Sequence, residues 1–66
     1  MKNTLKVERA KLDMTQQQLA DVVGVSRQTI NSIEAGGYTP STILALKISG
    51  VFKLSVNQIF LLEDDD

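Results

Sequence analysis

The segment from Thr15 to Glu34, TQQQLADVVGVSRQTINSIE, constrains the fold more than any other part of the chain. Thr15 and Gln18 form a capping box, T-x-x-Q, which is typical of a helix start. Gly24 suits the left-handed residue that ends a helix, and Ser26 suits the cap of the next one. The pattern therefore predicts two short helices joined by a tight turn.

The second of these helices has two unlike faces. At roughly 100° per residue, Ile30 and Ile33 fall together and define the buried direction. The outward set is polar and contains no acidic residue: Arg27, Gln28, Asn31 and Ser32. Arginine can pair with guanine, and asparagine or glutamine with adenine, in the major groove of DNA. We therefore expect these four side chains to contact bases, although any exposed helix face is polar and an ordinary surface is the alternative.

The start of the first helix is a candidate contact for the DNA backbone. Helix N-termini offer free N–H groups to phosphates, so we expect Thr15 and Gln16 to lie against phosphates. Thr15 also has a purely structural explanation as a cap, and the two roles are compatible. Tyr38 and Thr39, after the second helix, are weaker phosphate candidates, and Tyr38 is equally explained as a packing residue.

Arg9 requires a partner, since it shares one helical face with Leu5 and Leu12. An arginine in line with two leucines is costly unless its charge is paired. Glu34 lies nearer the buried side of its helix than Gln28 does. We predict a structural Arg9–Glu34 ion pair.

The pattern in the rest of the chain predicts three more helices. We expect residues 1–66 to form one domain. One covers about residues 4–12, another residues 42–52 after a Ser41 cap, and the last follows Ser55. Residues 60–62 either end the last helix or form a short terminal strand. We expect an all-α fold of five helices, with a frayed acidic tail at residues 63–66.

The composition excludes several functional classes. The 66 residues include no cysteine and no histidine, so there is no disulfide, no favoured zinc site and no residue for the commonest acid–base or nucleophilic chemistry. Gly36-Gly37 lacks the spacing and the lysine of a phosphate-binding loop. We expect no enzyme, cofactor, metal or small-molecule ligand. With no long apolar run and no secretory signal, we expect a cytoplasmic protein without a membrane contact.

The charge is unevenly distributed along the chain. The net charge of −1 combines a balance of +3 in residues 1–62 with −4 in the acidic tail. The body is thus only mildly basic, and binding to DNA would depend on where its charges lie more than on their number.

The segment 42–52 is apolar almost all round, which a domain of this size cannot easily cover. We expect a homodimer in which two symmetry-related helices read half-sites about 34 Å apart. The predicted interface residues are Ile43, Leu44, Val51, Phe60, Leu61 and Leu62. The alternative is that the terminal leucines cover only the domain's own core.

Several motifs, in this order, resemble the Cro/repressor (Xre-type) helix-turn-helix family: RAKLDMTQQQLA, VGVSRQTINSIE, YTPS, LALKI and NQIF. The match runs from Leu5 to Phe60 and looks like short regulators that consist of little besides a DNA-binding domain. The resemblance implies a five-helix fold and dimeric binding to double-stranded operator DNA. By position it implies base contacts for Arg27, Gln28 and Ser32, and an Arg9–Glu34 pair.

One departure from the family pattern concerns the residue after the glycine that follows the second helix of the pair, the reading helix whose polar face is expected to contact bases. Many relatives have lysine or arginine there, whereas this chain has Gly36-Gly37. The function we expect is a dimeric transcriptional regulator, more often a repressor in so short a chain. An antitoxin-like protein that binds a partner through its C-terminal apolar face, and an adaptor without a DNA role, are the alternatives.

Overall fold

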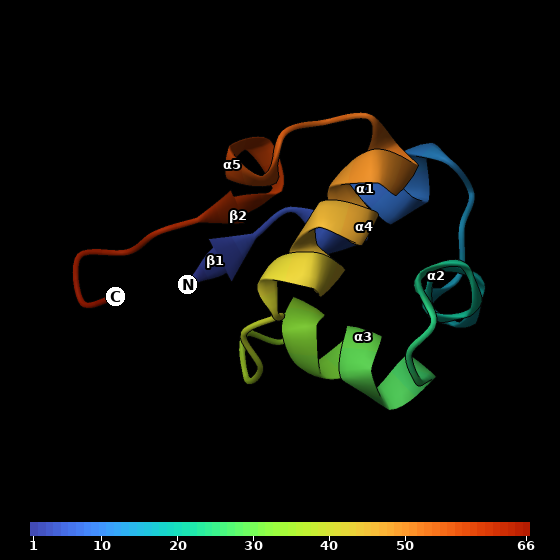
Figure 1. Ribbon diagram of the computed structural model, residues 1–66, viewed down its shortest axis with the longest axis horizontal. Helices are drawn as coiled ribbons and strands as arrows, with labels where there is room; N and C mark the ends of the chain where they lie inside the picture. Colours follow the sequence, from blue (N-terminus) through green and yellow to red (C-terminus); the bar gives the residue numbers. More distant parts are fainter.

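The computed structural model describes all 66 residues as five helices and a two-stranded sheet (Figure 1). The expected fold of five helices is confirmed. None of the helices is long and apolar enough to cross a membrane. In chain order the elements are β1 (Lys2–Asn3), α1 (Leu5–Lys11), α2 (Gln16–Val23), α3 (Arg27–Glu34), α4 (Thr42–Phe52), α5 (Val56–Ile59) and β2 (Phe60–Leu61).

The two ends of the chain pair as a short antiparallel sheet. Lys2 lies opposite Leu61 and Asn3 opposite Phe60, which settles the open choice for the C-terminal segment in favour of a strand. The Thr4 N–H continues the pairing by donating to the Ile59 carbonyl at 2.9 Å. The sheet thus closes the fold beside α5 (Figure 1).

Side-chain caps fix where the helices begin. The hydroxyls of Thr15, Ser26 and Ser41 each accept the N–H three residues later, at 3.0 to 3.2 Å. At α1 the Asn3 side chain accepts the Leu5 N–H, whereas the Thr4 side chain makes no cap. Local sequence therefore determines most helix starts, because a cap satisfies backbone donors that the helix leaves free.

Two glycines terminate α2 and α3. Gly24 and Gly36 have φ angles of 79° and 83°, a left-handed conformation that glycine adopts without steric cost. After α3, Gly36 N–H donates to the Ile33 carbonyl and Gly37 N–H to the Ser32 carbonyl. These two bonds are the Schellman pattern, which ends a helix by satisfying its last carbonyls.

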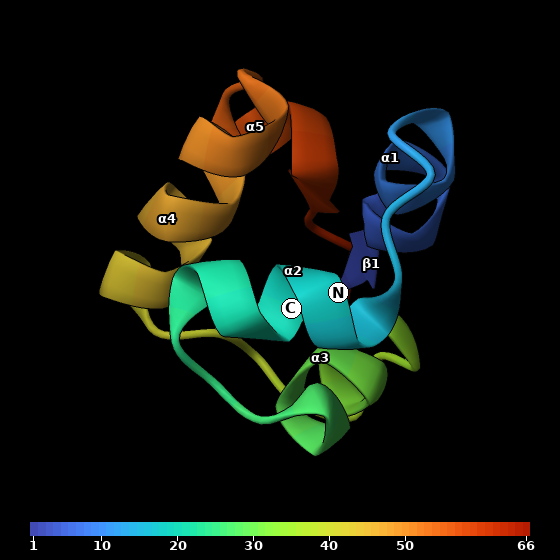
Figure 2. The same ribbon diagram turned by 90° about the vertical axis from the view of Figure 1, so that its right-hand side faces the viewer.

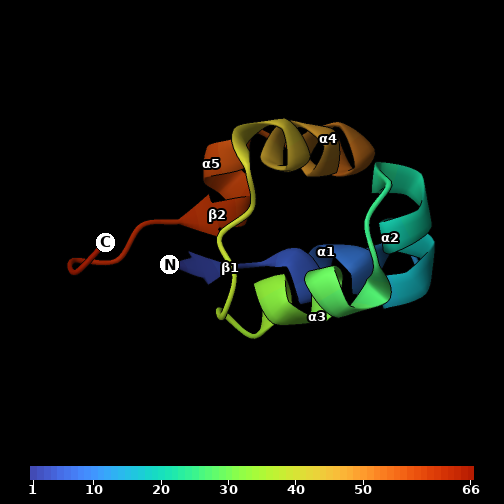
Figure 3. The ribbon, with the colours of Figure 1, turned by 60° about the horizontal axis from the view of Figure 1, so that its bottom comes forward.

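Eleven buried apolar residues form one core that all five helices and β2 share. Views from the side show α2 and α3 packed together, with α4 on the far side of the core from α3 (Figures 2 and 3). Leu5 is fully buried, as expected, but Leu12 is 53% exposed. The expected face of Leu5, Arg9 and Leu12 is wrong at its last member, because α1 ends at Lys11 and the chain turns away.

The acidic tail contacts the N-terminus. The Met1 amine lies 3.1 Å from both Glu63 Oε1 and Asp66 Oδ1. A hydrogen bond with Asp66, then one with Glu63, raises the pKa of that amine. The four tail residues are exposed, and fraying there stays a prediction.

Candidate nucleic-acid interface

Helix α3 separates its side chains as the periodicity predicts. Ile30 and Ile33 are 0% and 1% exposed, whereas Arg27, Gln28 and Asn31 are exposed. Ser32 is partly buried and lies closer to the protein than the other three. The helix therefore has a free polar edge, and the Gln28 side chain on that edge makes no hydrogen bond with the protein.

The expected ion pair joins α1 to the end of α3. Arg9 Nε donates to Glu34 Oε2 at 2.6 Å, and Nη2 donates to Oε1 at 3.0 Å. Arg9 Nη1 also donates to the Met14 carbonyl at 2.8 Å. The side chains of Arg9 and Glu34 are only 13% and 7% exposed, so the pair is largely shielded from water.

Burial alone would raise the pKa of Glu34, because it disfavours the charged carboxylate. Hydrogen bonds from Arg9 and then from Gln16 outweigh this effect and hold the pKa of Glu34 below its ordinary value. The same hydrogen bonding to Glu34 raises the pKa of Arg9. Both groups are therefore charged at neutral pH.

Gln16 has a position that sequence reasoning missed. Its Nε2 donates to Asn31 Oδ1 at 3.2 Å and to Glu34 Oε1 at 3.1 Å, while Arg27 Nη1 approaches its Oε1 at 3.4 Å. The residue thus links the start of α2 to both ends of α3. No local pattern signals such a contact, because it depends on how two separate helices cross.

The start of α2 keeps free donors despite its caps. Thr15 and Gln18 complete the capping box by bonding each other's backbone N–H groups. The backbone N–H groups of Gln16 and Gln17 have no acceptor within the protein. This helix end therefore satisfies the chemical requirement for holding an anion.

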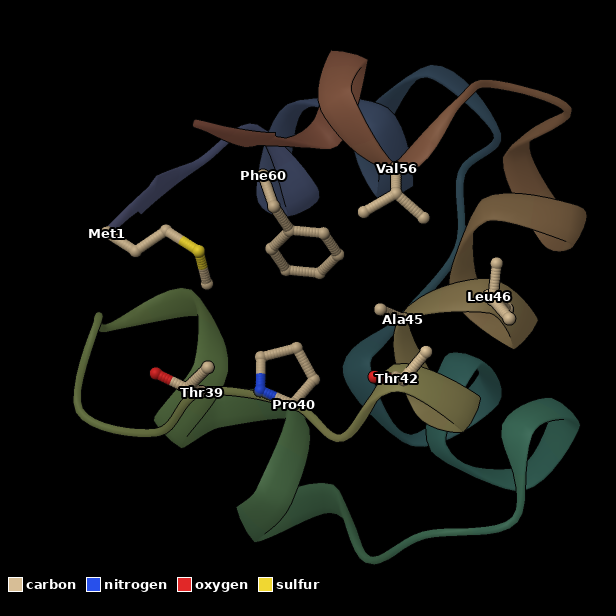
Figure 4. A pocket seen from close by; sticks show the side chains of 8 residues that line it. All are labelled: Met1, Thr39, Pro40, Thr42, Ala45, Leu46, Val56 and Phe60. Atoms are coloured by element: carbon tan, nitrogen blue, oxygen red, sulfur yellow. The ribbon is translucent and has the colours of Figure 1, made fainter. Parts of the chain in front are cut away.

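The loop before α4 holds the two weaker candidates for a phosphate contact, Tyr38 and Thr39, in different surroundings. Tyr38 is 44% exposed and lines a surface hollow with Thr29 of α3 and Lys47 of α4. Thr39 instead borders an apolar pocket that includes Met1 and Pro40 (Figure 4). Lys47 is a cation that the sequence did not place near α3.

The six expected interface residues divide into two groups. Leu44 and Phe60, 6% and 8% exposed, belong to the protein's own core, and Val51 is partly buried. Leu44 and Phe60 therefore have little surface to offer a second copy, and the interface assignment of all six residues stays a prediction. Ile43, Leu61 and Leu62 are 68%, 41% and 82% exposed.

Exposed Leu46 on α4 extends this apolar surface. It lines a pocket of about 220 Å³, together with Ala45, Val56 and Phe60 (Figure 4). Phe60 also borders a second hollow that contains Leu61 and Leu62. The two hollows form an apolar C-terminal face, which consists of Leu46, Val56, Phe60, Leu61 and Leu62.

Two short helices that pack together across a tight turn, the second with a polar outer edge, are the arrangement of the helix-turn-helix class of DNA-binding proteins. A family model described as "Helix-turn-helix" matches residues 5–59. The chain belongs to this family, in its Cro/repressor (Xre) branch, and is a DNA-binding transcriptional regulator and no enzyme.

Relatives of similar length support this assignment. A protein named as an HTH-type transcriptional regulator in Methanocaldococcus jannaschii is 52% identical over 66 residues, which cover both chains completely. One in Bacillus subtilis is 44% identical with the same complete coverage. One in Archaeoglobus fulgidus is 44% identical, covering all of this chain and 93% of its own.

Proposed function

We propose that this protein is a homodimeric repressor that inserts α3 into the major groove of a partly palindromic operator. The observation that carries the proposal is the polar edge of α3, which stays exposed while Ile30 and Ile33 anchor the helix in the core. Arg27, Gln28, Asn31 and Ser32 are the proposed base contacts. The protein would act on chromosomal DNA in the cytoplasm.

Contacts to the DNA backbone would orient the reading helix. At the start of α2, the free N–H groups of Gln16 and Gln17 are suited to one phosphate beside the Thr15 cap. The side chain of Gln16 is engaged within the protein, so its backbone carries the proposed contact. Tyr38 and Thr39 remain proposed contacts in the loop after α3.

Dimerisation through the apolar C-terminal face would supply the second reading helix. The domain has one such helix and a longest dimension of 31 Å, so reading two half-sites about 34 Å apart takes two copies. Leu46 and Leu62 on this face are 59% and 82% exposed, and a second copy is the occupant we propose for the pocket that Leu46 lines. In an antitoxin-like protein, a toxin would cover the same face.

Selection of bound fragments from random duplexes tests this function. We expect an enriched sequence with two related half-sites. Gln28→Ala should lose preference at one base pair of each half-site, with a cost of about 1–3 kcal/mol in discrimination. Val22→Ala is the matched control, since Val22 is exposed on α2 and has no proposed contact with DNA. An unchanged preference in Gln28→Ala would refute the placement of α3 in the groove.

Sedimentation tests the dimer separately. We expect the wild-type chain to be dimeric at tens of micromolar and Leu62→Ser to be monomeric. Val22→Ser should remain dimeric, because Val22 is also exposed but lies on α2. A monomeric wild-type chain that binds one copy per site would exclude the dimer, and binding of only a second protein on this face would favour the antitoxin-like function.

A further inference from the structure

Both ends of the Gln16 side-chain amide are directed at the protein. One N–H donates to Glu34 Oε1 and the other to Asn31 Oδ1, while its oxygen faces the Arg27 guanidinium. An amide flipped by 180° would put its oxygen against the carboxylate of Glu34, which only accepts hydrogen bonds when ionised. Glu34 therefore determines which end of the Gln16 amide faces it.

This orientation extends one step further, to the reading edge of α3. Because Gln16 presents an N–H to Asn31, that N–H occupies one acceptor site of the Asn31 oxygen and holds the oxygen toward Gln16. The Asn31 side chain makes no other hydrogen bond with the protein, and the residue is exposed, which leaves its amino group for DNA. A chain of bonds thus runs from Arg9 through Glu34 and Gln16 to the side chain of Asn31.

We propose that Glu34, acting through Gln16, makes Asn31 a hydrogen-bond donor toward DNA, so that Asn31 selects guanine over adenine. Adenine recognition uses both ends of the amide, its oxygen accepting from N6 and its nitrogen donating to N7. Guanine offers two acceptors, N7 and O6, on the same edge, which a donor alone can read. The sequence alone had suggested adenine. The proposal depends on the proposed function, and Glu34 and Gln16 are positioning residues in it.

A merely structural role for Gln16 would have a different signature. A glutamine that only ties α2 to α3, or only helps to hold a phosphate, changes affinity for all sequences by the same factor. A residue that sets the polarity of Asn31 changes which base is preferred at one position. The readout must therefore be base identity and not affinity alone.

The experiment selects bound duplexes from a random library with four proteins: wild type, Asn31→Ala, Gln16→Met and Val22→Met. Asn31→Ala identifies the base pair that Asn31 reads. At that base pair we expect wild type to select guanine. Gln16→Met keeps the length of the side chain but removes its hydrogen bonds, and should lower the guanine-over-adenine preference there by about tenfold. Val22→Met puts the same new side chain at an exposed position of α2 outside the network and should change no preference.

The outcomes separate this inference from the proposed function. Adenine at the Asn31 position in wild type would overturn the inference, and this result needs no variant of Gln16 to fold. Two other results would also overturn the inference. One is a Gln16→Met protein that binds every sequence more weakly and keeps its guanine preference, and the other is an Asn31→Ala protein whose base preference is unchanged at every position. In these cases sequence-specific DNA binding stands. If wild type enriches no duplex, the proposed function fails and the inference fails with it.

Discussion

Helices α3 and α4 begin in the same way and differ in what they turn outward. Each starts after a serine whose hydroxyl accepts the N–H three residues later, and each buries isoleucine in the common core. The outer face of α3 carries amides and a guanidinium. The outer face of α4 carries Ile43 and Leu46, which are 68% and 59% exposed.

The difference shows that the core fixes the inner face of a helix and leaves the outer face free for other tasks. A polar outer face remains hydrated until a hydrogen-bonding partner replaces the water. An apolar outer face contributes to stability only when a partner covers it, because burying apolar surface is favourable by about 25 cal/mol per Å². This difference is the reason for proposing partners of different chemistry, DNA for α3 and a second copy for the side of α4 and β2.

The largest effect expected from breaking the attachment of α3 comes from Arg9→Met. It leaves the buried Glu34 carboxylate without its cation, and we expect the free energy of unfolding to fall by about 3–5 kcal/mol. Urea denaturation measures it. Lys11→Met is the matched control: Lys11 pairs with Glu8 at 3.3 Å but is 64% exposed, so it should cost less than about 1 kcal/mol. Equal costs for the two variants would contradict a structural role for the Arg9–Glu34 pair.

The contrast between inner and outer faces is tested by the same substitution at two isoleucines. Ile30→Ala on α3 removes a fully buried side chain and should cost about 2–5 kcal/mol. Ile43→Ala on α4 removes an exposed one and should change the unfolding free energy of the monomer by about 0.5 kcal/mol or less. Denaturation at low protein concentration measures both. A large loss of monomer stability in Ile43→Ala would mean that α4 has no free outer face.

The helix boundaries and the polar edge of α3 are predictable because their causes are local. Thr15, Ser26 and Ser41 are caps beside apolar periodicity, and Gly24 and Gly36 are the only glycines with left-handed backbone. These signals lie within a few residues of the structure they determine. The Arg9–Glu34 pair was predictable for a different reason, since a charge on a buried face demands an opposite charge.

The features that sequence reasoning missed depend on contacts between distant segments. β1 has two residues, too few for any alternating pattern, and it forms only because β2 reaches it. Leu12 matches the apolar period of α1 but lies past its end. The burial of Leu44 and Phe60 depends on which side of α4 and β2 faces the core. Periodicity alone does not choose between two apolar sides.

Acid should weaken the attachment of α3 and leave that of α4 unchanged. The pKa of Glu34 is lowered from its ordinary value of 4.5, so the pair's contribution is fully present above about pH 4.5 and is lost as pH falls through the lower folded pKa. Unfolding free energies of wild type and Arg9→Met, compared from pH 7 downward, should converge below pH 4.5. A difference that stays constant with pH would mean that Glu34 does not titrate with the ion pair.

The smallest expected effect comes from placing a cation after α3, where many relatives have lysine or arginine. Gly37 has no left-handed φ, and a Cβ there would lie 3.8 Å from the Ser32 carbonyl oxygen, an ordinary contact. Gly37→Lys should therefore fold normally and add about one phosphate contact. The plot of log affinity against log salt should steepen by about 0.9, equally for operator and unrelated DNA. Gly36→Lys is the contrasting variant, because the φ of 83° strains any side chain there. An unchanged slope in a folded Gly37→Lys protein would place the loop after α3 away from the DNA backbone and would argue against the contacts proposed for Tyr38 and Thr39.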